Sequence, residues 1–206
     1  MKIIFQGDSI TDCGRHVEQH GNWGLGDGYV NLVASELLAT EVEKSLKIIN
    51  KGISGNRVVD LYARWKSDIL NEKPDVLSIL VGINDTWHKF LSNNGIEPAH
   101  YKEIYTKLLT WTLAEFPNVK LILGVPFAFT CGVVTKEWIE ELKVRQEMVR
   151  ELAKEFNASY IEFQEIFDAA LKRAPMEYWL GDGVHPTLAG HHLMKNEMVK
   201  VIQKLI

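Results

Sequence analysis

The sequence predicts an α/β fold in which helices cover both faces of a parallel sheet, a three-layer α/β/α sandwich. Five short apolar runs recur along the 206 residues, and segments with the spacing of amphipathic helices lie between them. Because the runs are continuously apolar, both faces of each strand are expected to be buried, which is typical of a parallel sheet. The length suits one domain, so we expect residues 1–206 to form a single one.

Predicted strands and helices alternate along the chain. The strands, in chain order, are 2–5, 46–50, 76–81, 119–125 and 159–163. Helices between them are indicated by apolar residues three or four positions apart: Val30, Val33 and Leu37, then Val58, Leu61, Trp65 and Ile69, then Ile139, Leu142, Val149, Leu152 and Phe156. Helix 135–155 carries charges of both signs, which is typical of a solvated face.

The last helix is predicted to begin at Thr187, directly after Pro186, because proline is favoured at helix starts. Its apolar residues fall on one stripe, namely Met194, Met198, Val201 and Leu205. Such a stripe predicts a side that faces the core rather than a cofactor site.

The composition excludes several classes of protein. Hydrophobic residues make up 46% and charged residues 24% of the chain, close to the average of soluble globular proteins. With 23 Lys and Arg against 27 Asp and Glu, the net charge is −4, and no run of basic residues could follow a phosphate backbone. We therefore expect no nucleic-acid partner.

The sequence also favours a cytoplasmic protein. The apolar stretch Ile3-Ile4-Phe5 ends far short of a signal-peptide core, and no later run approaches membrane-spanning length. The two cysteines, Cys13 and Cys131, cannot form a disulfide framework and lack the spacing of metal ligands. We expect no membrane partner, no metal and no other cofactor, and no functional role for either cysteine.

Polar residues and glycines gather where the predicted strands end, which is where open parallel sheets bind their ligands. The loops after the first three strands and the loop before the last helix read Gly7-Asp8-Ser9-Ile10-Thr11-Asp12, Lys51-Gly52-Ile53-Ser54-Gly55-Asn56, Gly82-Ile83-Asn84-Asp85 and Gly181-Asp182-Gly183-Val184-His185-Pro186. Together they contain a hydroxyl, an acid–base pair, a side-chain amide and a backbone N–H next to glycine.

These residue types favour a serine nucleophile. The Ser9 hydroxyl reacts weakly near neutral pH, so it needs a base to take its proton, and the base needs a partner that fixes its tautomer. His185 and Asp182, three residues apart in one turn, could supply both. Acyl transfer also builds negative charge on the carbonyl oxygen, and the candidate donors are the N–H groups of Ser9 and Gly55 and the amide of Asn84.

Each motif alone has a plainer interpretation. Gly-Asp-Ser after a strand is usually a turn that leads into a helix, and Asp-Gly and His-Pro are common turn dipeptides. Asn84 and Asp85 could simply cap a helix. The catalytic interpretation depends on the conjunction, because four separate loops each carry a residue type that one reaction needs.

The four motifs resemble the four blocks of the GDSL/SGNH hydrolases. The blocks correspond to Gly7-Asp8-Ser9, to Gly55 within Ile53-Ser54-Gly55-Asn56, to Asn84 within Gly82-Ile83-Asn84-Asp85, and to Asp182-Gly183-Val184-His185-Pro186. The resemblance implies a flavodoxin-like five-stranded sheet and no metal. It also implies that Ser9 is the nucleophile and that Asp182 and His185 complete the triad. Gly55 and Asn84 would belong to the oxyanion hole.

Within that family the sequence is similar to the cytosolic acetylxylan esterase branch of the carbohydrate esterases. The matching segments are Asp8-Ser9-Ile10-Thr11-Asp12-Cys13-Gly14-Arg15, Asn50-Lys51-Gly52-Ile53-Ser54-Gly55-Asn56, Ala63-Arg64-Trp65, Lys73-Pro74-Asp75 and Gly82-Ile83-Asn84-Asp85-Thr86-Trp87. The similarity implies a serine esterase for small O-acyl groups, above all acetyl groups on xylo-oligosaccharides. A lysophospholipase, a thioesterase or a general short-chain esterase of the same family stays open, because the triad reports the reaction and not the substrate.

Asp8 and Trp87 are the candidates for substrate binding. Trp87 could form a sugar-stacking wall, although an aromatic residue in such a loop more often packs against its neighbours. A glycine-rich stretch after the nucleophile could border the pocket, and its candidate residues are Arg15, His16, His20 and Trp23.

Several other residues are expected to be structural. Arg64 and Trp65 lie on a predicted helix. The adjacent His191 and His192 lie on the last helix without the His-Glu-x-x-His pattern of a zinc site.

A binding module without hydrolytic activity is the alternative from another class. The sequence has no G-x-G-x-x-G after the first strand and no G-x-x-x-x-G-K-[ST], so the phosphate-binding features of a nucleotide module are missing. A carbohydrate-binding relative without activity would have little reason to keep Ser9, Asn84, Asp182 and His185 together. We therefore expect a small acyl ester as the partner, and a homo-oligomer stays possible.

Overall fold

The structure, a computed structural model, describes residues 1–16 and 24–206. It contains a five-stranded sheet in the order β2-β1-β3-β4-β5. The strands are β1 (Lys2–Gly7), β2 (Lys47–Asn50), β3 (Val76–Leu80), β4 (Lys120–Gly124) and β5 (Ser159–Ile161). Every pairing is parallel, so the carboxyl ends of the strands meet at one edge of the sheet.

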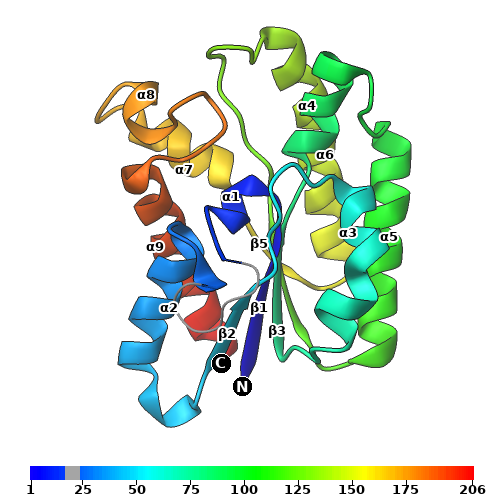
Figure 1. Ribbon diagram of the computed structural model, residues 1–206, viewed down its shortest axis with the longest axis vertical. Coiled ribbons are helices and arrows are strands. Elements are labelled where there is room, and N and C mark those ends of the chain that lie inside the picture. The colour runs from blue at the N-terminus through cyan, green and yellow to red at the C-terminus, as the bar shows by residue number, and fades with distance from the viewer. Residues whose placement is uncertain (17–23) are drawn as a thin grey trace.

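Two layers of helices enclose the sheet (Figure 1). One layer holds α2 (Tyr29–Thr40), α7 (Phe163–Ala170) and α9 (Leu188–Leu205), and the other holds α3 (Val58–Trp65), α5 (Pro98–Glu115) and α6 (Lys136–Glu155). Three further helices lie toward the end of the molecule where the strands finish: α1 (Ser9–Asp12), α4 (Ile83–Ser92) and α8 (Met176–Trp179). A 3₁₀ turn (Val42–Lys44) follows α2, and a π turn (Lys66–Leu70) follows α3. The predicted three-layer α/β fold is confirmed, and the prediction of a single domain over residues 1–206 stays a prediction.

The strands send alternate residues into two separate cores. In β1, Ile3 and Phe5 enter the core beneath α2 and α9, whereas Ile4 enters the core beneath α3 and α5. All three side chains are fully buried. Burial on both faces explains why the strands read as unbroken apolar runs.

Strand bounds differ in places from those predicted. β1 continues to Gly7, because Gln6 and Gly7 also pair with β3. The fifth strand ends at Ile161, and Phe163, which we expected in the strand, begins α7. Val125 is buried although it lies beyond β4. An apolar run reports burial, and burial continues past the last paired residue of a strand.

The last helix starts close to the predicted position. Thr187 caps α9, and its Oγ1 accepts from the N–H of Gly190 at 3.3 Å. Met194 and Met198 are fully buried, so the methionine stripe faces the core, as predicted. Within the described residues, no helix combines the length and apolar character needed to cross a membrane.

Candidate active site

The four loops with unusual residues meet at the edge of the sheet where the strands end. β2, β1 and β3 are neighbours, so the loops after them lie side by side. Hydrogen bonds join them: the Ser54 N–H donates to Asp12 Oδ2 at 2.9 Å, and Asn84 Nδ2 donates to the Asn56 carbonyl at 3.2 Å. The first loop is thus tied to the second, and the second to the third.

Ser9 lies in the first turn of the short helix α1. Asp8 caps this helix, since its Oδ1 accepts from the Ile10 N–H at 3.1 Å. The helix ends after one turn at Cys13, whose φ of 39° is left-handed. The turn places Ser9 Oγ 2.8 Å from Nε2 of His185, a residue 176 positions further along the chain.

His185 and Asp182 form a hydrogen-bonded pair in the turn before α9. His185 Nδ1 lies 2.7 Å from Asp182 Oδ2, and Asp182 Oδ1 accepts from the N–H groups of Val184 (3.0 Å) and His185 (2.8 Å). Gly183, with a left-handed φ of 86°, lets the backbone fold around the carboxylate. Burial raises the pKa of Asp182, but the hydrogen bonds from His185 and Val184 outweigh it, and the pKa lies below its ordinary value. A carboxylate next to His185 Nδ1 favours the tautomer with the proton on Nδ1, and in that tautomer the Nε2 lone pair faces Ser9.

Three N–H groups in these loops have a hydrogen to spare. Within the described part of the chain, the backbone N–H groups of Ser9 and Gly55 donate no hydrogen bond. Asn84 Nδ2 gives one of its two hydrogens to the Asn56 carbonyl, which orients the amide and leaves the second hydrogen free. Gly55 has a φ of 80°, which disfavours any side chain although a Cβ would meet no atom within 4 Å. The first three loops thus offer three donors that have no other acceptor among the described residues.

The structure does not place Asp8 at the surface of this site. Its side chain is 0% exposed and lies beneath Ser9 as the cap of α1. The expectation that Asp8 contacts substrate is therefore corrected, because a sealed carboxyl cannot reach a bound molecule. The sequence could not separate the two placements, since an Asp before a Ser at a strand end is compatible with both.

Asp8 and Asp85 form a buried carboxyl pair behind the site. Asp85 is also 0% exposed, and both of its oxygens accept from the Val58 N–H at 3.2 Å. Asp8 Oδ2 has no hydrogen-bond partner among the described residues. Burial raises the pKa of both carboxyls to about 7. The negative charge of Asp85 raises the pKa of Asp8 further, whereas the positive charge of Arg145 lowers the pKa of Asp85 and so opposes the effect of burial. Asp85 thus holds the start of α3, and the cap position of α4 is occupied by Gly82.

We expect the Tm of the wild type to fall as the pH rises from about 5 to about 8, and we expect a smaller fall for Asp8→Asn. Burial places the folded-state pKa of Asp8 above the value of about 4 for an unfolded chain. Its contribution is therefore fully present below about pH 4 and is lost as the pH rises through about 7. Over this pH range the Tm of the wild type should fall by at least about 4 °C more than the Tm of Asp8→Asn. In a chain of this size, a change of 1 kcal/mol in the free energy of unfolding shifts the Tm by about 2–4 °C.

The control for this measurement is Glu155→Gln, which removes an exposed carboxyl on α6. Its Tm should follow the wild type at every pH. If Asp8→Asn and the wild type show the same pH dependence of Tm, the buried carboxyl of Asp8 is not the group that titrates.

Arg64 holds the second loop from beneath. Its guanidinium donates to the Lys51 carbonyl at 2.8 Å, to Asn56 Oδ1 at 2.9 Å and to Gln6 Oε1 at 2.9 Å. It also pairs with Asp68 one turn further along the chain. The positioning role fits the expectation that Arg64 is structural.

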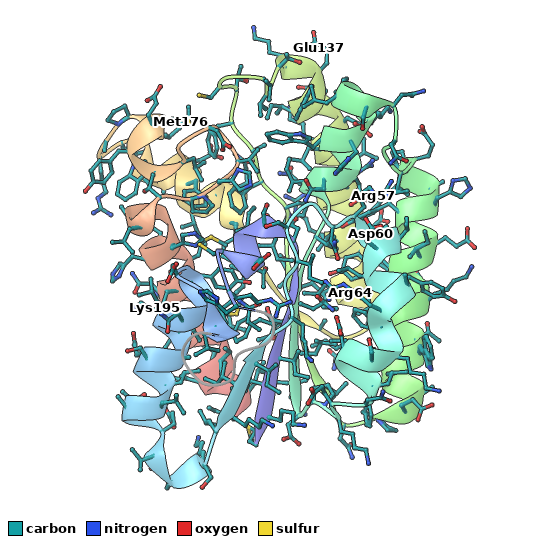
Figure 2. The ribbon with its side chains drawn as sticks, viewed as in Figure 1. Arg57, Asp60, Arg64, Glu137, Met176 and Lys195 are labelled. Atoms are coloured by element: carbon teal, nitrogen blue, oxygen red, sulfur yellow. The ribbon has the colours of Figure 1, made fainter. Side chains whose placement is uncertain are left out.

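α3, which carries Arg64, is itself anchored at several points. The buried Trp65 donates its Nε1–H to Thr112 Oγ1 at 3.0 Å. Arg57 pairs with Asp60 in the first turn, where Figure 2 shows the two side chains together, with Arg64 further along the helix. The second loop therefore rests on a fixed helix.

The stretch after the nucleophile also reaches the second loop. Arg15 Nε donates to the Gly52 carbonyl, so this side chain joins the first and second loops. His16 is exposed. His20 and Trp23 lie outside the described residues.

Trp87 lies beside His185 at the margin of the site. It follows Asn84 by one turn of α4, and its ring centroid is 6.2 Å from that of His185, with the rings at 62°. On its other side it meets Trp138 of α6 edge-on at 5.3 Å. Nothing in the sequence singles out Trp138, because an aromatic residue in the first turn of an amphipathic helix looks like any core residue.

His191 belongs to the packing of α2 against α9. Its Nδ1 accepts from the Tyr29 N–H at 3.1 Å, and its Nε2 lies 3.3 Å from Cys13 Sγ. Burial lowers the pKa of His191 to about 4. Cys13 and Cys131 are both free thiols, and the described residues contain no group of three or more His, Cys, Asp and Glu placed to hold a metal ion.

Comparison with known proteins decides the family. The sequence profile of the GDSL-like Lipase/Acylhydrolase family matches residues 5–193. The chain belongs to this family. It is 37% identical to an acetylxylan esterase of Geobacillus stearothermophilus over 211 residues, which cover 98% of this chain and 93% of that enzyme. The resemblance noted in the sequence is thereby confirmed, and the chain is a carboxylic ester hydrolase.

Solved structures show that the GDSL fold extends over the whole chain. A protein of Parabacteroides merdae described as a GDSL-like lipase superposes with a TM-score of 0.94 at 39% identity, covering 100% of this chain and 96% of that one. A mutant of an acetyl-xylooligosaccharide esterase of G. stearothermophilus superposes with a TM-score of 0.89 at 33% identity, covering 98% and 93%. The sheet and its helices are thus those of the GDSL esterases.

Proposed function

We propose that this GDSL esterase hydrolyses small O-acyl esters through an acyl-enzyme on Ser9, with His185 as the base and Asp182 as its partner. The observation that carries the proposal is the unbroken series of contacts from Ser9 Oγ to His185 Nε2 (2.8 Å) and from His185 Nδ1 to Asp182 Oδ2 (2.7 Å). Solved catalytic mutants of the Geobacillus enzyme replace a serine, an aspartate and a histidine, and its aspartate and histidine are three positions apart. Asp182 and His185 have the same separation, which supports the assignment.

In the proposed first step, His185 Nε2 takes the proton of Ser9 as Oγ attacks the acyl carbon. Asp182 accepts from Nδ1–H and stabilises the imidazolium that forms. The charge on the carbonyl oxygen is held by the N–H groups of Ser9 and Gly55 and by the second amide hydrogen of Asn84. The imidazolium then gives its proton to the leaving alcohol, and a water activated by the same base releases the acid from Ser9.

We further propose that the acyl group is acetyl and that the alcohol is a xylo-oligosaccharide. The support is the similarity to an acetylxylan esterase along nearly the whole length of both chains. A lysophospholipase, a thioesterase or a general short-chain esterase would share the same triad, so the substrate is what a measurement has to decide. The cytoplasmic location, the absence of nucleic-acid, membrane and cofactor partners, and a homo-oligomeric state stay predictions.

The acyl preference is tested with p-nitrophenyl acetate, butyrate and octanoate. We expect kcat/KM for the acetate to exceed that for the octanoate by at least about tenfold, because a pocket shaped for a methyl group leaves a long chain without a place. Acetylated xylo-oligosaccharides and a lysophospholipid are assayed beside them, and only the former should be cleaved. Faster cleavage of octanoate or of the lysophospholipid would contradict the proposed substrate and leave the triad assignment in place.

A further inference from the structure

One side of α4 carries the amide of the candidate oxyanion hole and two aromatic rings. Asn84, Trp87 and Phe90 are three residues apart, so they follow one another along one side of the helix, about 4.5 Å apart in rise. Exposure increases along this series, from 8% at Asn84 to 40% at Phe90, with Trp87 partly exposed between them. The stripe therefore runs from the reacting centre out to solvent.

Trp138, in the first turn of α6, supports both rings from behind. It is 3% exposed, meets Trp87 edge-on at 5.3 Å and 73°, and stacks on Phe90 at 5.3 Å and 15°. Figure 2 labels its neighbour Glu137 at the end of the molecule where the strands finish. Because Phe90 stays 40% exposed although one face is stacked on Trp138, part of its surface is open to a bound molecule.

The indole N–H of Trp87 is also available. Trp65 and Trp179 donate their Nε1–H groups to Thr112 Oγ1 and to the Ala174 carbonyl. The Trp87 Nε1–H has no acceptor among the described residues, and it is not one of the buried atoms left without a partner, so it reaches solvent.

The reaction places the leaving alcohol against this surface. The acyl C–O bond to the alcohol breaks, and the alcohol oxygen receives the proton that His185 took from Ser9, so this oxygen must bind within hydrogen-bonding reach of His185 Nε2. The Trp87 ring lies 6.2 Å from the His185 ring, centroid to centroid, so it is a candidate contact for the body of the alcohol. The carbonyl oxygen points instead to the N–H donors of the loops.

We infer that Trp87 and Phe90, braced by Trp138, form the subsite that binds the leaving alcohol, and that this alcohol is a pyranose sugar. A pyranose has faces of C–H groups that pack on aromatic rings and a rim of hydroxyls that can accept from the Trp87 N–H. The inference rests on the proposed function, because it needs His185 as the proton donor. It adds two residues, Phe90 and Trp138, that the four loops do not contain.

The test compares kcat/KM for acetylated xylobiose with kcat/KM for methyl acetate, whose alcohol cannot reach the rings. We expect Trp87→Ala and Phe90→Ala each to lower the ratio of the two values by at least about tenfold. Trp87→Phe keeps an aromatic face and loses the N–H, so its ratio should lie between those of the wild type and Trp87→Ala. Tyr160→Ala is the matched control, since this ring is 49% exposed on the edge strand β5 and should leave both values unchanged.

The outcomes separate the inference from the proposed function. A ratio equal to that of the wild type in Phe90→Ala and in Trp87→Ala would overturn the inference and leave the esterase activity in place. Phe90→Ala alters a partly exposed side chain, so it carries the test alone if Trp87→Ala does not fold. Failure of the unsubstituted protein to cleave either ester would overturn the proposed function, and the inference with it.

Discussion

Ser9→Ala is expected to abolish ester hydrolysis and to leave the fold intact. Without Oγ, no acyl-enzyme can form, and the rate should fall by about 10⁴-fold or more, the range found when one member of a serine triad is removed. Ser9 is partly exposed at the start of α1 and belongs to neither core, so the loss of one hydroxyl leaves the two cores unchanged. The measurements are turnover of p-nitrophenyl acetate and Tm by circular dichroism.

His185→Ala should be nearly as inactive, and the double variant scarcely worse than either single one. The two side chains act as a unit, so removing the second removes nothing that the first variant still used. His192→Ala, which changes an exposed histidine on α9, is the control and should keep the wild-type rate. Wild-type turnover by Ser9→Ala would exclude Ser9 as the nucleophile.

Asn84→Ala should lower kcat by about 10²–10³ with little change in KM, because a donor to the oxyanion acts mainly as charge develops. A helix cap would instead cost about 1 kcal/mol of stability and leave turnover unchanged. The amide of Asn84 donates to the Asn56 carbonyl, and Gly82 occupies the cap of α4, so we expect the kinetic effect to dominate. Both kcat and Tm are measured for each variant.

Two further variants sharpen this test. Asn84→Asp keeps the shape of the side chain but replaces the donor with an acceptor, so its kcat should be at least as low as that of Asn84→Ala. Asp85→Ala removes the acceptor of the Val58 N–H and should lower the Tm by about 5 °C or more while changing kcat much less. An Asn84→Ala protein that is destabilised and fully active would remove Asn84 from the oxyanion hole.

The sheet could be predicted from the sequence because its cause is local. The strand β1 is buried on both faces, because Ile3 and Phe5 enter one core and Ile4 enters the other. Three consecutive apolar residues are therefore enough to predict it. The sequence does not define the bounds of the strands, as at Phe163, because an apolar residue is buried equally well at the end of a strand and at the start of a helix.

The loops of the candidate site were predictable for a related reason, and its surroundings were not. Parallel strands bring the residues after them to one edge, so chemistry-bearing residues at strand ends can be grouped without coordinates. The positions of Asp8 and Trp138 cannot be predicted in this way. The position of Asp8 depends on the direction of its side chain, and that of Trp138 depends on which helices pack together. The hydrogen bonds from Arg64 to Gln6, Lys51 and Asn56 cannot be predicted in this way either.

The contact between Ser9 and His185 joins residues that are 176 positions apart. The hydroxyl is therefore synthesised 176 residues before the imidazole that we propose as its proton acceptor. The turn with Asp182 and His185 is then brought into place as α9 packs against α2, where the His191 ring contacts the Tyr29 backbone. During refolding, we therefore expect the recovery of esterase activity to follow the docking of the last helix rather than the formation of the sheet.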